Sequence, residues 1–138
     1  MDLHSAAATI EQVLELGQRQ VSRRQATTSP LEAERLADRA ALEQVDYLLM
    51  EHWDTLDDIA AGRPVDALTR ADQSHIWELA SGVRVAQPPS EALRRVSELA
   101  RRELDESSRG RASDWQAVLW LQEYVRRHAS RLDRVAER

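Results

Sequence analysis

The sequence predicts an all-α protein, a single compact domain over residues 1–138 built as a bundle of five or six helices. Three observations carry this prediction. Apolar residues recur at helical spacing along most of the chain, and Ser, Thr, Gly and Pro stand where helices should begin and end. Strand-like alternation is nearly absent, because the one β-like run, Val83–Val85, is too short and too isolated to build a sheet.

The first half of the chain contains two expected helices. The first covers Ser5–Gln25 and is broken by the run Thr27–Pro30. Ser29-Pro30-Leu31-Glu32 is a capping box with proline at the first helical position, which predicts a second helix from Pro30 to about Ala61. A further capping box at Thr55–Asp58 predicts an interruption of that helix.

Glycine and proline divide the second half in the same way. Gly62 suits a left-handed cap at the end of the second helix, and a short helix is then expected over Thr69–Gly82. Pro88-Pro89 begins a helix that reaches about Ser107. A capping box at Ser113–Gln116 opens the last helix, over residues 114–137.

Charge is distributed unevenly. Residues 1–88 carry 15 acidic side chains and 8 Arg, a net −7, whereas residues 89–138 carry 9 acidic side chains and 11 Arg, a net +2. A non-specific nucleic-acid coat should be basic overall, so this balance argues against that class of protein. It leaves room for a local contact surface, or for an acidic face that meets a basic protein partner.

The composition also predicts where the protein works. No apolar run approaches the roughly 20 residues of a membrane span, and the start of the chain lacks the basic region of a signal peptide, so we expect a cytoplasmic protein with no membrane contact. Lys, Asn and Phe are absent and all 19 basic residues are Arg, which is typical of a GC-rich bacterial or phage genome.

No catalytic site is legible. The chain has no cysteine, and neither an acid–base pair nor a nucleophile–base pair stands out, so we expect a protein that binds rather than an enzyme, without a cofactor. His75 and Glu78 have the spacing of a helical metal-binding pair, but no second pair of that kind exists. A metal site is therefore not expected.

Tryptophan supplies most of the aromatic content. Trp53, Trp77, Trp115 and Trp120 are expected mainly to fill the core in place of Phe. Trp115 and Trp120 cannot share one helix face, because five residues rotate by about 500°, so at least one should be partly exposed. An exposed tryptophan is a candidate for contact with a partner.

Residues 55–104 contain three consecutive segments that follow a known pattern of short helices. Thr55–Ala60 is similar to the T-x-x-E-[IV]-A segment that opens one helix, Gln73–Gly82 follows an S-x-[YH]-I-x-x-[LI]-x-x-G pattern, and Pro88–Val96 resembles the helix that comes next. This segment resembles a helix-turn-helix domain of the Cro and lambda-repressor type. The resemblance departs from the family in the long loop before Thr69, and in Glu78 on the expected recognition helix.

The resemblance implies a DNA-binding regulator. Gln73, Ser74 and Trp77 would face outward from the recognition helix, with Gln73 and Ser74 reading base edges, while Arg70 and Arg84 would hold phosphates at its two ends. The alternative is a helical protein-interaction module, such as an adaptor, a chaperone or an antitoxin-like inhibitor, with no DNA contact. The two differ in whether the face of Gln73 and Trp77 is exposed.

The last expected helix carries an apolar seam at heptad spacing, formed by Val118, Leu121, Val125, His128 and Leu132. We expect this seam to form the interface of a homodimer, since DNA readers of this size commonly dimerise. In a monomer the same stripe would face the core.

Overall fold

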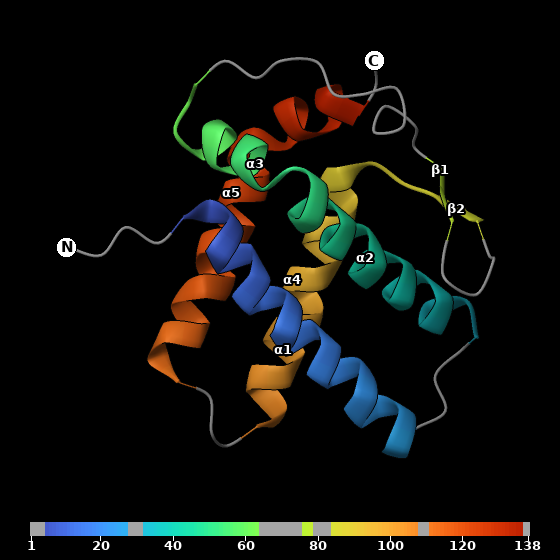
Figure 1. The fold of residues 1–138 in the computed structure, drawn as a ribbon. Helices are drawn as coiled ribbons and strands as arrows, with labels where there is room; N and C mark the ends of the chain where they lie inside the picture. The colour runs from blue at the N-terminus through green and yellow to red at the C-terminus, as the bar shows by residue number, and fades with distance from the viewer. Residues whose placement is uncertain (1–4, 28–31, 64–75, 79–83, 108–110, 137–138) are drawn as a thin grey trace.

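Five helices and one short hairpin make up the part of the chain described by the computed structural model, which covers residues 5–27, 32–63, 76–78, 84–107 and 111–136 (Figure 1). The helices are α1 (Ala6–Thr27), α2 (Glu32–Glu51), α3 (Trp53–Ala60), α4 (Pro89–Glu106) and α5 (Ala112–Ala136). The strands β1 (Ile76–Glu78) and β2 (Arg84–Ala86) pair antiparallel. The predicted all-α bundle is confirmed, with this hairpin added to it.

Helix α4 is the centre of the bundle, because it packs against α1, α2 and α5 (Figure 1). Its apolar stripe is completely covered: Leu93 and Val96 are 0% exposed, and Leu99 is 1% exposed. Gly17 of α1 lies where α1, α2 and α4 meet, and a Cβ atom built there would come within 3.2 Å of the side chain of Leu42. The absence of a side chain at Gly17 therefore lets α1 approach its neighbours closely.

Two carboxylates from distant helices cap helix starts. Asp57 of α3 accepts a hydrogen bond from the backbone N–H of Ala7 at 3.0 Å, in the first turn of α1. Asp133 of α5 accepts from the backbone N–H of Ser90 at 2.9 Å and from its hydroxyl at 2.7 Å, at the start of α4. Both carboxylates satisfy donors that a helix leaves without an internal partner, and both sit where the helix dipole favours negative charge.

The second expected helix is divided at His52, not at Thr55. His52 has φ −134° and ψ 33°, and α3 begins directly after it with no side-chain cap. The turn buries Leu56 and Ile59 in the core, and the carbonyl of Leu56 accepts a hydrogen bond from the buried Tyr124 hydroxyl at 2.9 Å. Tertiary packing thus places the break, and the capping box at Thr55–Asp58 does not. Gly62 has the expected left-handed conformation, with φ 76°.

The apolar seam of α5 faces the core of its own chain. Val118 and Leu121 are 0% exposed, Val125 and Leu132 are 3% exposed, and His128 is half-buried with its ring centroid 5.2 Å from that of Tyr124. The expected dimer interface along this seam is therefore wrong. A heptad stripe has the same spacing whether it meets a second copy or the rest of its own bundle, and here α1, α3 and α4 cover it.

The expected recognition helix is also wrong where the chain is described, since Ile76–Glu78 is strand β1. Its register pairs Ile76 with Ala86, Trp77 with Val85 and Glu78 with Arg84. β-Branched and aromatic residues favour paired strands, and Ile, Trp and Val supply three of the six positions. Arg84 and Val85 belong to the run that looked too isolated to pair, and they pair with a segment whose apolar spacing resembled a helix.

Candidate functional site

The residues expected to contact DNA are not assembled into a helix by the described structure. Arg70, Gln73 and Ser74 lie outside the described residues. Trp77 is in β1 and Arg84 is in β2, at neighbouring positions of the two paired strands. A helix-turn-helix domain docks by laying a recognition helix in the major groove, and residues 76–78 do not provide one.

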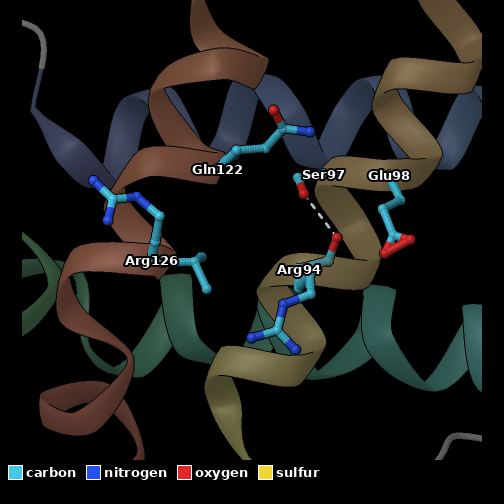
Figure 2. Close-up of a pocket in the computed structure, with 6 residues that line it drawn as sticks. Arg94, Ser97, Glu98, Gln122 and Arg126 are labelled. Carbon is cyan, nitrogen blue, oxygen red and sulfur yellow. Dashed lines mark hydrogen bonds between the residues drawn. The ribbon is translucent and has the colours of Figure 1, made fainter.

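A shallow pocket of about 230 Å³ lies between α4 and α5 and is lined by Arg94, Ser97, Glu98, Gln122, Val125 and Arg126 (Figure 2). Its polar groups are already engaged or diverge. The hydroxyl of Ser97 donates to the carbonyl of Arg94 at 2.7 Å, so no base activates it, and Arg94 pairs with Glu91. The charged ends of Arg94, Glu98 and Arg126 point in different directions (Figure 2). This pocket does not concentrate charge on one ligand.

Charges on the outer surface of α5 are paired along the helix. Glu123 accepts hydrogen bonds from both Arg126 and Arg127, with the Arg127 Nε atom at 2.8 Å. These two guanidinium groups lower the pKa of the Glu123 carboxyl to about 2. The pairs at i, i+3 and i, i+4 are those of a solvated helix face.

A different surface forms where α2 turns into α3. Met50 is 71% exposed and Trp53, three residues later, is 36% exposed. Asp46, Glu51 and Asp54 are exposed beside them. We call these five residues the α2–α3 corner. Leu48 and Leu49, adjacent to Met50, are each 6% exposed, so α2 has filled its core positions and Met50 is apolar area left facing solvent.

The carboxylates of the α2–α3 corner have no basic partner among the described residues. Asp46, Glu51 and Asp54 form no ion pair or hydrogen bond through their side chains with the described residues. Glu51 is also the last residue of α2, whose final turn has no basic side chain, so its charge lies at the negative end of the helix dipole. The corner therefore has two exposed apolar side chains and three carboxylates that no described side chain pairs, and Asp54 lies in the first turn of α3.

The remaining large exposed apolar side chain in the described part of the chain is Leu119 of α5, at 59%. It stands alone, and a single exposed apolar residue is ordinary on a protein surface. Trp115 and Trp120 pack against the core and are both partly exposed, whereas the sequence predicted that at least one would be. Trp120 stacks on Tyr124 with ring centroids 4.9 Å apart. Among the tryptophans whose side chains are described, Trp53 is the exposed one.

The sequence indicated an acidic face suited to a basic protein partner but did not locate this surface. Trp53 was expected mainly to fill the core, the exposed tryptophan was expected at Trp115 or Trp120, and Met50 was not singled out. The available signal was that Leu48, Leu49, Leu56 and Ile59 already supply a complete buried stripe, which leaves Met50 with no inward position.

Comparison with protein-family models, with curated proteins and with solved structures found no match to this chain. Among the described residues, no helix has the length and apolarity to cross a membrane, and no group of three or more His, Cys, Asp or Glu side chains is placed to hold a metal ion.

Proposed function

We propose that this protein is a helical protein-interaction module that binds a basic partner at the α2–α3 corner. The observation that carries the proposal is that Met50 and Trp53, three residues apart where α2 turns into α3, are both exposed, with three exposed carboxylates nearby in the chain that have no partner among the described residues. Tryptophan is enriched among the residues that dominate binding energy, and methionine is common on surfaces that adapt to partners. An apolar centre within a charged rim is the ordinary anatomy of a protein interface.

Charge complementarity selects the kind of partner. Asp46, Glu51 and Asp54 favour a segment rich in Arg or Lys, whose cationic side chains would pair with the rim. A guanidinium or ammonium group could also lie over the face of the Trp53 indole, which is the best aromatic partner for a cation. A DNA backbone is negatively charged, as this surface is, and would be repelled by it.

The proposal retains the expected cytoplasmic protein of regulatory or adaptor type and places its contact surface on α2 and α3. DNA binding through Arg70, Gln73, Ser74, Trp77 and Arg84 stays a prediction. A homodimer stays a prediction too, but it needs a surface other than the buried seam of α5. Light scattering at micromolar concentration tests the dimer by giving the mass in solution.

Site-specific cross-linking tests the proposed surface. A photoreactive amino acid placed at Glu51, with a matched placement at exposed Gln116 of α5, should capture a partner from a lysate of the source organism at the first position and not at the second. The captured protein should be basic, and its purified form should bind Trp53→Ala about 10–100-fold more weakly than the wild-type chain. Equal affinity for Trp53→Ala would refute the proposal.

A gel-shift screen with genomic fragments at low salt separates the DNA alternative. The proposed function predicts no retained fragment. A fragment retained by the wild-type chain and released by Gln73→Ala would favour DNA binding over the protein-interaction module.

A further inference from the structure

Sulfur is nearly absent from this chain. The sequence has no cysteine and two methionines, Met1 and Met50, so Met50 is the single internal sulfur atom. At 71% exposed, its side chain is open to dissolved oxidants. Oxidative chemistry on sulfur therefore has one internal target, and that target lies in the apolar pair of the α2–α3 corner.

We propose that Met50 is an oxidation site through which hydroperoxides weaken binding at the α2–α3 corner, an inference that rests on the proposed function. The Met50 thioether attacks one oxygen of the peroxide, an S–O bond forms and the O–O bond breaks. Sulfur loses two electrons to become the sulfoxide, and hydrogen peroxide is reduced to water. The product side chain is polar and chiral, and methionine sulfoxide reductases reverse the change.

The position of Met50 separates its effect on binding from any effect on folding. The adjacent Leu48 and Leu49 hold α2 in the core and are unchanged by the oxidation, whereas Met50 itself makes little contact with the bundle. A sulfoxide at this position replaces part of the apolar centre by a strongly polar S=O group. The apolar side chains of a partner, which would otherwise cover the thioether, would then have to desolvate that group without donating a hydrogen bond to it.

The first measurement concerns the site itself. The purified full chain is treated with dilute hydrogen peroxide under native conditions and its peptides are mapped by mass spectrometry. We expect Met50 to gain one oxygen as fast as free methionine does, with the thermal unfolding midpoint unchanged. Protection of Met50 from peroxide, or a large fall in that midpoint, would overturn the inference.

The second measurement couples oxidation to binding. The probe is a synthetic amphipathic helical peptide with arginine on its polar face and leucine on its apolar face. We expect oxidation to weaken its binding to the wild-type chain by about tenfold and methionine sulfoxide reductase to restore it. Whatever affinity the untreated Met50→Leu chain has for the probe, peroxide should leave that affinity unchanged. Met50→Gln, a polar side chain of similar length, should bind as weakly as the oxidised chain.

The outcomes distinguish the two proposals. If the untreated chain binds the probe and the oxidised chain binds it equally well, the oxidation site is wrong and the proposed function stands. If peroxide weakens Met50→Leu as much as the wild-type chain, another residue is responsible and the inference again fails. Both proposals fail if the untreated wild-type chain does not bind the probe. They also fail if the Trp53→Ala variant binds the probe as tightly as the untreated wild-type chain does.

Discussion

Helices α4 and α5 are consecutive and pack together, and we call this pair the α4–α5 hairpin, as distinct from the β1–β2 hairpin. Its outer face and the α2–α3 corner are both exposed helical surfaces, but they differ in whether their charged side chains are paired. On the hairpin, Arg94 pairs with Glu91 at 2.6 Å, and Glu123 is shared by two arginines. At the corner, three carboxylates have no such partner among the described residues. The charged side chains of the hairpin pair with one another, whereas the three carboxylates of the corner have no basic partner among the described residues.

Apolar exposure follows the same division. Leu119 is alone on the hairpin, whereas Met50 and Trp53 are three residues apart at the corner. The difference teaches that exposure by itself is a weak sign of function in this protein. The corner differs because exposed apolar side chains and carboxylates without a described basic partner occur there together. Either feature alone is found on ordinary solvated surfaces.

The largest expected effect is a loss of stability from a substitution in the buried interior of the α4–α5 hairpin. Leu93→Ala removes a side chain that is 0% exposed and should lower the free energy of unfolding by about 2–5 kcal/mol. Leu119→Ala, on the outer face, should change it by less than about 0.5 kcal/mol. Urea denaturation of both variants provides the measurement. A similar fall in the free energy of unfolding for both variants would contradict the exposure of Leu119.

A smaller effect is expected at the cap that joins the two hairpin helices. Asp133→Ala removes both acceptors at the start of α4 and should cost about 1–2 kcal/mol in the free energy of unfolding. Asp133→Asn keeps one carbonyl acceptor and should lose less. Chemical denaturation compares the two variants, and an Asp133→Ala protein as stable as the wild type would show that this contact contributes nothing.

At the α2–α3 corner we expect a substitution that stabilises the protein. Glu51→Lys replaces an unpaired acid by a base at the C-terminus of α2, and should raise the free energy of unfolding by about 0.3–1 kcal/mol. The same change should weaken binding of the arginine-rich peptide. Glu91→Lys on the hairpin breaks an ion pair and serves as the matched control, with no expected gain. A Glu51→Lys chain that is both less stable and fully active in binding would erase the distinction between the surfaces.

The smallest effect should come from one half-buried imidazole at the bend of α5, where His128 has φ −120° and ψ 15°. Burial, together with the positive charges of Arg131 and Arg127, lowers the pKa of His128 below its ordinary 6.5. The unfolded chain therefore binds the proton more readily, and this contribution to stability is present above pH 6.5 and declines as the pH falls below it. Denaturation between pH 8 and pH 5 should show a steeper fall for the wild type than for His128→Gln, and equal slopes would contradict the shift.

Local signals in the sequence were sufficient for the helices whose ends are set by their own residues. The Pro88-Pro89 start leads into α4 at Pro89, and Gly62 has the left-handed conformation expected beyond α3. Both depend on backbone chemistry that acts over a few residues. The break at His52 depends instead on where Leu56 and Ile59 reach the core, which no local motif encodes.

The errors concern patterns with two physical solutions. Ile76 and Leu79 have the spacing of a helix face, but Ile76–Glu78 pairs with Arg84–Ala86 because a strand partner is available a few residues later. The α5 seam is apolar in either a monomer or a dimer, and the fold decides which. The candidate surface was only partly predictable for the same reason: Met50 is outward because four neighbours already fill the core.

The remote caps have a consequence for how the molecule opens. In most helices the first backbone N–H groups exchange their hydrogens early, because each end frays without disturbing the rest. Here the N–H of Ala7 is held by a residue 50 positions away, and that of Ser90 by a residue 43 positions away. Neither end can fray without detaching from α3 or from the far end of α5. Deuterium uptake at these two amides should therefore follow the opening of the whole bundle, which makes two helix starts reporters of global unfolding.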